Sequence, residues 1–449
     1  MCCSTRFSVP ATLALMLAAG TALGQGSFRT IVPDAGFDYA VIQDVSGDGT
    51  KVLVSLQNSQ QGPSPLYVYT LDLASNARVN IQDPFGSDLN GLAMSADGSV
   101  VVGSLGGGPL ASVNAFVWRS ETGVVNISGL PNSNLSYATG VSADGNVVVG
   151  SSGTNFGDPY QQGWRLSENG LEALEDINTP SGDDILIFST VEGVSANGLT
   201  IFGTGATGDF DPDTDNEVYS GALWQNGSLT PTNIGNTPAP FPAVSSGYAS
   251  SADGSVVVGI GGGFGPGNSY VNRAFRWTQP GGYQDLGSLP GLPQGSTYGF
   301  DCSADGNTVV GYFINGGVNT WEAFVWTPQR GMRSLRQILA NASITIPANI
   351  RLRETFTDDA GRVIAGWAYN STTQRYVGYV ATLPLACEYD FNRDENVDLT
   401  DAQQMAQVFV GLIPAQPGWL DGDLNGDENA DLTDAQLLAA FVVSGQCGV

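Results

Sequence analysis

A run of apolar residues that follows a short polar turn recurs along most of the chain. A clear copy is Val141-Ser-Ala-Asp-Gly-Asn-Val-Val-Val-Gly150. Asp-Gly and Asn-Gly pairs supply the positive φ angles that a two-residue hairpin turn needs, and the β-branched residues after them favour a strand. The valine runs lack alternating polar residues, which predicts strands covered on both faces. The turn glycines of the seven copies are Gly49, Gly98, Gly145, Gly198, Gly254, Gly306 and Gly361, spaced 47 to 56 residues apart.

Each unit carries further strand signals after the turn. A segment of the type Ala115-Phe-Val-Trp118 follows most turns, and a short apolar strand such as Gly282-Tyr-Gln-Asp-Leu286 comes after another turn. With the segment that leads into the turn, each unit holds about four strands, which is the signature of a β-propeller blade. We therefore predict a mainly β fold, with a seven-bladed β-propeller of ~50-residue repeats over residues 25–385.

Closure of the ring is also predictable. The seventh unit stops after Tyr376-Val-Gly-Tyr-Val-Ala-Thr382, short of its last strand, and Phe28-Arg-Thr-Ile-Val-Pro33 resembles the missing strand. We predict that this N-terminal segment completes the seventh blade.

The composition excludes several classes of function. The formal charge is −27, Lys51 is the single lysine, and histidine is absent from the 449 residues. Nucleic acids and anionic membrane surfaces attract clustered cations, so neither is an expected partner. The absence of histidine excludes Ser-His, Cys-His and His-metal mechanisms. Calcium is a better candidate ligand for so acidic a chain.

Residues 1–24 have the pattern of a signal peptide. Arg6 precedes a short apolar core, and small residues before Gln25 favour cleavage there. The core is shorter than the ~20 residues of a membrane span, so we expect a secreted or cell-surface protein. Exported proteins can keep disulfides. We expect Cys387 to pair with Cys447, leaving Cys302 as a buried free thiol.

The order Ser-Ala-Asp-Gly-x-Val-Val-Val-Gly, Ala-Phe-x-Trp and Leu-Gly-x-Leu-Pro resembles the bacterial extracellular repeats called HAF, after a His-Ala-Phe tripeptide. Here Asn114, Arg273 and Glu322 stand where that family has histidine. The resemblance covers most of residues 28–384. It implies a secreted propeller-like array of unassigned role and no catalytic residue.

The acids of the repeats are expected to serve the turns rather than catalysis. Glycoside hydrolysis needs two carboxylates that face each other across a cleft, and no motif indicates such a pair. One acidic insertion has oxygen side chains at every second position, which either bind calcium or form a solvated loop. Its acids are Asp209, Asp211, Asp213 and Asp215.

Residues 386–449 carry a more specific pattern. Two twelve-residue segments, 33 residues apart, place oxygen side chains at loop positions 1, 3, 5, 7, 9 and 12. An EF-hand loop supplies calcium with six to eight oxygens at this spacing, so we predict two calcium sites. Position 7 normally donates its backbone carbonyl. The predicted ligands are Asp390, Asn392, Asp394, Asn396, Asp398 and Asp401, and Asp423, Asn425, Asp427, Asn429, Asp431 and Asp434.

Each loop is followed by a helical pattern, at 402–410 and 435–443, with apolar residues at i, i+3 and i+4. A duplicated loop with aspartate at position 12 and one helix per loop resembles a type I dockerin. That family implies an α-helical module that docks onto a cohesin module of another protein. The residues that usually carry the contact correspond here to Leu399, Thr400, Leu432 and Thr433.

The loops depart from the EF-hand pattern at position 6, which is normally glycine. Glu395 and Glu428 stand there. A left-handed conformation costs a non-glycine residue about 1 kcal/mol, which weakens binding about fivefold to tenfold. The alternative to two calcium sites is a degenerate acidic pair that folds around its disulfide alone.

We therefore expect a secreted, non-catalytic binding or assembly protein, in which the dockerin-like module presents the propeller to a cohesin-type partner. One alternative is a carbohydrate-active component of a complex for polysaccharide catabolism, and glycans remain possible ligands of the propeller. Another is a freestanding calcium-stabilised extracellular protein. Two close acids in an aromatic-lined pocket at one propeller end would favour the enzyme, whereas flat, loop-covered ends would favour the binder.

Overall fold

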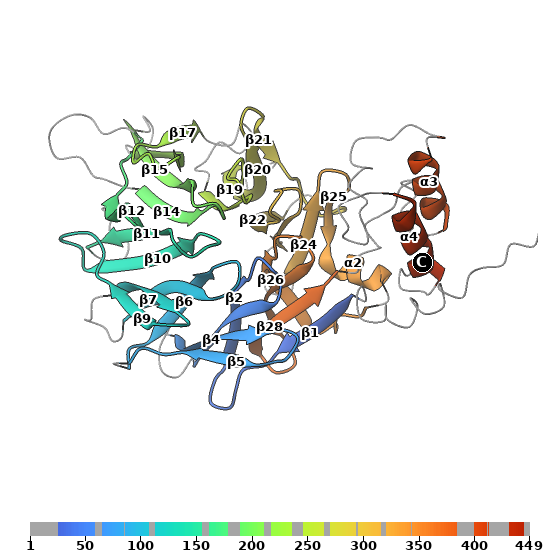
Figure 1. Cartoon of the computed structure of the whole chain (residues 1–449), viewed down its shortest axis with the longest axis horizontal. Helices are drawn as coiled ribbons and strands as arrows, with labels where there is room; N and C mark the ends of the chain where they lie inside the picture. Colours follow the sequence, from blue (N-terminus) through green and yellow to red (C-terminus); the bar gives the residue numbers. More distant parts are fainter. Residues whose placement is uncertain are drawn as a thin grey trace, which may run out of the picture. The chain divides into compact units, whose positions relative to one another are not determined.

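A computed structural model describes most of the chain (Figure 1). The described residues are 26–58, 65–84, 86–106, 113–154, 161–177, 189–210, 217–235, 246–264, 270–292, 295–315, 320–342, 344–383, 399–410, 412 and 431–443. They belong to two units, of which the larger comprises Phe28–Ile338 and Ile346–Ala381 and the smaller includes Thr382–Val449. The strands fall into sets of four that follow one another along the chain, except that β1, from the N-terminal segment, belongs to the last set.

The first strands of the sets are β2 (Tyr39–Val45), β6 (Leu89–Met94), β10 (Leu135–Val141), β14 (Ser189–Val194), β18 (Ser246–Ser250), β22 (Ser296–Cys302) and β26 (Ile350–Thr357). The second strands are β3 (Lys51–Gln57), β7 (Val100–Leu105), β11 (Val148–Gly153), β15 (Thr200–Phe210), β19 (Val256–Phe264), β23 (Val309–Ile314) and β27 (Val363–Asn370). The third strands are β4 (Pro65–Asp72), β8 (Asn114–Arg119), β12 (Gln161–Ser167), β16 (Glu217–Gln225), β20 (Tyr270–Thr278), β24 (Glu322–Thr327) and β28 (Arg375–Thr382). The fourth strands are β5 (Arg78–Ile81), β9 (Gly123–Ile127), β13 (Gly170–Ala173), β17 (Thr232–Gly235), β21 (Gly282–Asp285), β25 (Gly331–Ser334) and, from the N-terminal segment, β1 (Ser27–Ile31).

Five of these sets are separate four-stranded sheets, and the remaining strands form one eight-stranded sheet. In the larger sheet the order is β26-β27-β28-β2-β3-β4-β5, and β1 pairs with β28. The two halves meet at a single parallel pair, Tyr39 and Tyr376. The first strands contact one another in the closed cycle β2-β6-β10-β14-β18-β22-β26-β2. The mainly β architecture predicted from the repeats is confirmed.

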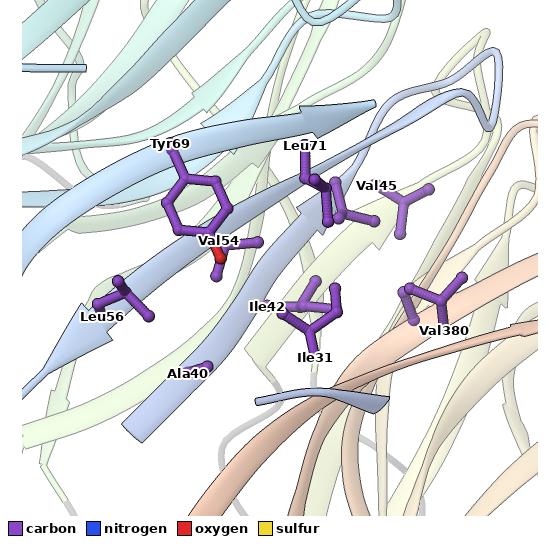
Figure 2. Packing of buried hydrophobic residues seen from close by; sticks show 11 residues of the cluster. Ile31, Ala40, Ile42, Val45, Val54, Leu56, Tyr69, Leu71 and Val380 are labelled. Atoms are coloured by element: carbon purple, nitrogen blue, oxygen red, sulfur yellow. The ribbon is translucent and has the colours of Figure 1, made fainter. Parts of the chain in front are cut away.

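Strand β1 joins the two ends of the larger unit. It is the strand predicted at Phe28–Pro33, and its pairing with β28 is the predicted one. Ile31 is 7% exposed and packs in one buried cluster with Ile42 of β2 and Val380 of β28 (Figure 2). Burial of such a side chain contributes about 1.5–3 kcal/mol. Strand β1 therefore closes the sheet through both its hydrogen bonds to β28 and the apolar contacts of Ile31.

The valine runs are covered on both faces, as predicted. Val148 and Val149 of β11 and Val101 and Val102 of β7 are at most 1% exposed. The repeated third-strand aromatic side chains pack between sheets, and Trp164 is completely buried. Each sheet therefore buries its middle strands against its neighbours.

The repeated turn holds its aspartate by a fixed set of hydrogen bonds. The Ser95 hydroxyl donates to Asp97 Oδ1 (2.8 Å) and accepts from the Val100 N–H (3.0 Å), while the Ser99 N–H donates to the same Asp97 oxygen (2.9 Å). The Ser99 N–H is the main group that lowers the pKa of Asp97. The corresponding serines of the other turns make equivalent bonds, at Ser46, Ser142, Ser195, Ser251 and Ser303. The interpretation of these acids as turn residues is confirmed.

One detail of the predicted turn is wrong. Gly98 has φ +66°, but Asp97 is not among the residues with positive φ. A two-residue turn of the predicted type needs positive φ at both central residues. Here the turn closes over four residues, with the Gly98 N–H donating to the Ser95 carbonyl (2.8 Å). The serine and aspartate side chains satisfy the inner backbone groups, so only the glycine adopts the left-handed conformation.

The seven turns are also bonded to each other. In each turn one backbone N–H donates to a carbonyl of the following turn, and the last turn donates to the first. The donor–acceptor pairs are Asp48–Ala96, Ala96–Ala143, Ala143–Ala196, Asn197–Ala252, Ala252–Ala304, Ala304–Asp359 and Asp359–Gly47, at 2.8–3.2 Å. We call this the turn ring.

A second glycine stands at the end of each valine run, and it is required for a different reason. In six of the seven units, a Cβ at this position would lie 1.8–2.1 Å from a carbonyl oxygen of the paired first strand. At Gly311 that oxygen belongs to Tyr298. The six residues are Gly103, Gly150, Gly203, Gly259, Gly311 and Gly366. Glycine is needed here for close backbone approach rather than for its φ angle.

Three helices are described. Helix α2 (Leu335–Asn341) follows β25, while α3 (Leu399–Phe409) and α4 (Leu432–Val443) lie in the smaller unit and contact each other. The two predicted C-terminal helices are present, and each begins three residues earlier than its apolar pattern. Among the helices of the described part of the chain, none has the length and apolar character that crossing a membrane requires.

Candidate functional site

The first strands of six sets carry a β-bulge at the same position. The bulged residue precedes the turn serine by three positions, so the strand pairing skips it. A bulge changes the direction in which the side chain of the extra residue points. The six bulged residues are Gln43, Leu92, Thr139, Glu192, Tyr248 and Phe300.

These six side chains line one cavity of about 450 Å³. Phe356 of β26 completes the lining from the seventh set, so every first strand contributes to the wall. Ligand sites of proteins are typically cavities of about 300–1,000 Å³ that combine apolar walls with a few polar groups. We call this cavity the inner cavity and consider it the candidate functional site.

Two carboxyl groups of the inner cavity bridge neighbouring sets. Asp44 accepts hydrogen bonds from the N–H groups of Val45 (2.8 Å) and of Met94 in the next set (2.7 Å). Asp301 occupies the same position in β22 and accepts from Cys302 (2.8 Å) and from Thr357 in the next set (2.8 Å). Each aspartate therefore ties two first strands together.

Burial changes the acidity of this pair. It raises the pKa of Asp44 to about 7 and that of Asp301 to about 8. The charge of Asp44 also raises the pKa of Asp301, whereas the N–H donors lower both values. Near neutral pH the two carboxyl groups are therefore only partly ionised, and each can donate or release a proton.

Glu192 provides a third carboxyl group, on β14. Burial raises its pKa to about 7, against a hydrogen bond with Thr190 that lowers it. Its charge raises the pKa values of Tyr137 and Tyr248, after the larger effect of burial on both. Tyr137 donates its hydroxyl to Gln161 Oε1 (2.5 Å), and Tyr248 stacks on Phe300 with ring centroids 5.3 Å apart. Glu192 lies on β14, between β10 with Tyr137 and β18 with Tyr248 in the cycle of first strands.

The aromatic stack continues from Phe300 to Tyr312 of β23, and Arg353 of β26 contacts the Tyr312 ring. Phe300 lies 5.6 Å from Tyr312, and the guanidinium of Arg353 lies 5.2 Å from the Tyr312 ring. The same guanidinium lies 4.5 Å from Trp321 and 4.6 Å from Trp367. Cation–π contacts of this kind are worth about 0.5–2 kcal/mol each, so Arg353 is held in place by three rings.

The described residues place part of the predicted calcium loops. Asp401 and Asp434, the residues of position 12, are completely buried in the first turns of α3 and α4. Asp434 Oδ2 accepts from the Asp431 N–H (2.7 Å), and Asp431 Oδ1 accepts from the Thr433 N–H (2.7 Å). The Thr433 side chain lowers the pKa of Asp431. Asp431 therefore caps the start of α4.

The predicted docking residues are at the surface. Leu399 is 51% and Leu432 42% exposed, and Thr400 and Thr433 are exposed beside them. Each pair lies at the start of its helix.

The remaining predictions fall on other parts of the chain. Cys302 is a buried free thiol, as predicted. The side chain of Asp209, in β15, is not described, and several other predicted site residues lie outside the described residues. These are Asp211, Asp213, Asp215, Asp390, Asn392, Asp394, Asn396, Asp398, Asp423, Asn425, Asp427, Asn429, Cys387 and Cys447. The described ranges contain no group of three or more acidic or cysteine side chains arranged to hold a metal ion.

The residues of the inner cavity were not predicted from the sequence. A signal for them exists, because the two positions before the last strand residue vary: the first differs in every copy and the second is Asp, Ala or Gly, while the turn is nearly constant. They read Gln43-Asp44, Leu92-Ala93, Thr139-Gly140, Glu192-Gly193, Tyr248-Ala249 and Phe300-Asp301. Variable polar and aromatic residues at a fixed place in a repeat indicate positions that packing does not dictate.

The chain was compared with known proteins. The chain is similar to the β-propeller domain of the Trilobed protease from Pyrococcus furiosus, which has an open velcro topology. The TM-score is 0.50 at 11% identity, over 77% of this chain and 96% of that one. An oligogalacturonate lyase in complex with manganese gives 0.48 at 13% identity, over 80% and 97%. TolB from Acinetobacter baumannii gives 0.37 at 12% identity, over 71% and 66%.

No protein-family model matches the chain, and no curated protein matches it by sequence. Identities this low carry no information about activity. The four-stranded sheets and the similarity to the Pyrococcus furiosus domain together show that the larger unit has a β-propeller fold.

Proposed function

We propose that this chain is a secreted, non-catalytic binding and assembly protein. In this proposal residues 1–24 direct export, a seven-bladed β-propeller carries the ligand site, and a dockerin-like module docks onto a cohesin-type partner. Calcium bound by the two C-terminal loops holds that module in its docking form.

The observation that carries the proposal is the duplicated helix start. In both copies an aspartate at loop position 12 is completely buried, and the Leu-Thr pair immediately before it is exposed. The twelfth position of a calcium loop supplies a carboxylate ligand to the ion, and a completely buried aspartate at that position in both copies is consistent with this role. Apolar side chains that stay exposed at equivalent places of two helices favour a contact with another protein.

The seven-bladed arrangement is supported by two closed cycles. The first strands contact one another in a cycle of seven, and the turn ring contains seven hydrogen bonds. Such a ring leaves its inner surface available to a ligand, and the inner cavity is our candidate for that site.

Calcium titration of the full chain tests the C-terminal module. We expect calorimetry to report two bound ions, and Asp401→Asn or Asp434→Asn to remove one ion each, since each change removes a charged oxygen ligand. Glu121→Gln, at an exposed propeller position, is the matched control and should leave both ions bound. A chain that binds no calcium, or binds it equally well in both aspartate variants, would contradict the proposal.

Binding to a cohesin module separates assembly from a freestanding role. Because the Leu-Thr pairs are identical, either copy should suffice. Leu399→Ala or Leu432→Ala alone should leave binding near its original level, and the double variant should abolish it. Calcium binding without any cohesin binding would support the freestanding calcium-stabilised protein instead.

A carbohydrate-active propeller is the second candidate, favoured by the carboxyl groups and aromatic rings that share the inner cavity. Against it, Asp44 and Asp301 each accept two backbone hydrogen bonds, which fix both carboxyl groups in orientation and lower their pKa values. Incubation with a panel of oligosaccharides tests this activity. We expect no released fragments; release that Glu192→Gln abolishes would establish the enzyme.

A further inference from the structure

The inner cavity combines acidic groups, aromatic rings and apolar side chains, and none of the described residues that line it is a lysine or an arginine. In the cycle of first strands, β14 with Glu192 is separated from β2 with Asp44 by two strands and from β22 with Asp301 by one strand. The cavity therefore presents separate acidic positions, with apolar and aromatic side chains elsewhere in its wall.

We propose that the inner cavity binds a small organic cation with two ammonium groups, such as an aliphatic diamine or polyamine. One ammonium group would pair with Glu192, and the other with Asp44 and Asp301. The inference deepens the proposed binding role of the propeller and does not depend on the C-terminal calcium sites.

The Glu192 position suits an ammonium group for two reasons. Its strand, β14, lies between the strands of Tyr137 and Tyr248, whose pKa values its charge raises, and Tyr248 stacks on Phe300 with ring centroids 5.3 Å apart. Aromatic faces attract ammonium groups by about 0.5–1 kcal/mol at exposed sites and about 2 kcal/mol when desolvated. A carboxylate bordered by rings therefore favours a cation over an anion or a neutral hydroxyl group.

The second position is the aspartate pair. Asp44 and Asp301 interact electrostatically and lie in the first strands on either side of β26. Their backbone N–H donors fix both carboxyl groups in orientation. An ammonium group has three donors, so it is able to bond to oxygens of more than one carboxyl group.

Apolar side chains form part of the cavity wall. Leu92, Phe300 and Phe356 line it, and they would contact the methylene groups of a diamine. Burial of each methylene contributes about 0.8 kcal/mol. The net charge of −27 also raises the local concentration of cations around the chain.

The pH dependence of binding follows from the raised pKa values. Asp44 and Glu192 have pKa values of about 7, and Asp301 about 8. Below pH 6 these groups are mostly protonated and attract a diamine weakly. Above pH 8 they are mostly ionised, so affinity rises with pH through this range and binding near pH 7 releases protons. The other titratable groups near them are Tyr137, Tyr248, Glu354 and Asp359, of which Asp359 also raises the pKa of Asp301.

Isothermal titration calorimetry on the full chain, with a calcium chelator present, tests the inference. The probes are spermidine and a series from diaminopropane to diaminooctane, with butylamine and pentanediol as single-charge and uncharged controls. We expect one site per chain, an affinity that peaks at one diamine length, and at least about tenfold weaker binding of both controls. The enthalpy should depend on the buffer, which reports proton release.

Variants assign the two positions. Glu192→Gln and Asp301→Asn should each weaken diamine binding at least about tenfold and reduce proton release, while Glu121→Gln should change neither. A circular dichroism melt would show whether Asp301→Asn unfolds. In that case the variant Tyr248→Leu is tested instead, and it should weaken diamine binding because the ring is lost. Equal binding of diamine and pentanediol, no pH dependence, or no diamine binding would overturn the inference. Because the chelator is present, none of these results bears on the calcium module.

Discussion

Replacement of Gly311 by alanine is expected to lower the free energy of unfolding of the propeller by about 3 kcal/mol. The new Cβ would lie 1.9 Å from the Tyr298 carbonyl oxygen and 2.8 Å from the ring of Phe324. Neither the carbonyl nor the buried ring can move without shifting a strand, because both lie in paired strands of one sheet. Chemical denaturation followed by tryptophan fluorescence would measure the loss.

The control for this variant is Gly123→Ala. Gly123 has φ +76°, but no atom lies within 4 Å of its added Cβ. Only the left-handed conformation is then penalised, at about 1–2 kcal/mol. Gly311 has no positive φ, so a loss at Gly311 that does not exceed the loss at Gly123 would show that close approach is not the reason for the glycine.

Replacement of Ile31 by alanine should destabilise the propeller by about 2–5 kcal/mol. Ile31 is the buried side chain of β1, and it packs with Ile42 and Val380 across the closure between the ends of the chain (Figure 2). Its loss leaves a cavity at that closure. We also expect faster proteolysis near β1, because the strand is short and depends on this side chain for apolar contact.

Val32→Ala is the matched control, one residue further on. Val32 is 63% exposed, against 7% for Ile31, so its truncation should change the free energy of unfolding by less than about 0.5 kcal/mol. Similar losses for the two variants, or unchanged proteolysis of Ile31→Ala, would mean that β1 does not fasten the closure.

The strands and their order are predictable because the same sequence pattern recurs in each unit. A turn glycine followed by β-branched residues, as at Gly145 and Val147–Val149, favours the same hairpin in each unit. The closing strand is predictable for a related reason, since one unit lacks a strand and the N-terminal segment has the matching apolar pattern. Agreement between several units makes the prediction stronger than any single segment would allow.

The inner cavity was not predictable in the same way. A bulge is one residue left over when two strands pair, so Glu192 and Phe300 are identified as bulged only after the register of both strands is known. The shifted pKa values of the acids in the cavity could not be predicted from the sequence either. Asp301 and Asp305 lie four residues apart, yet burial raises the pKa of Asp301, whereas hydrogen bonds from Ser303 and Asn307 outweigh burial and lower that of Asp305.

The C-terminal module illustrates the opposite case. Spacing alone predicts the calcium ligands, because the loop positions are set by coordination geometry. The described residues add only the ends of that pattern, the buried Asp401 and Asp434 beside the exposed leucines.

The turn ring separates two tasks that most small domains assign to the same residues. Its hydrogen bonds join backbone groups of neighbouring turns, and the nearly constant serines and aspartates fix the conformation of each turn. The six bulged residues lie three positions away and take no part in those bonds. Evolution can therefore exchange Gln43, Leu92 or Tyr248 one at a time, and alter what the cavity accepts, without loosening the frame that holds it.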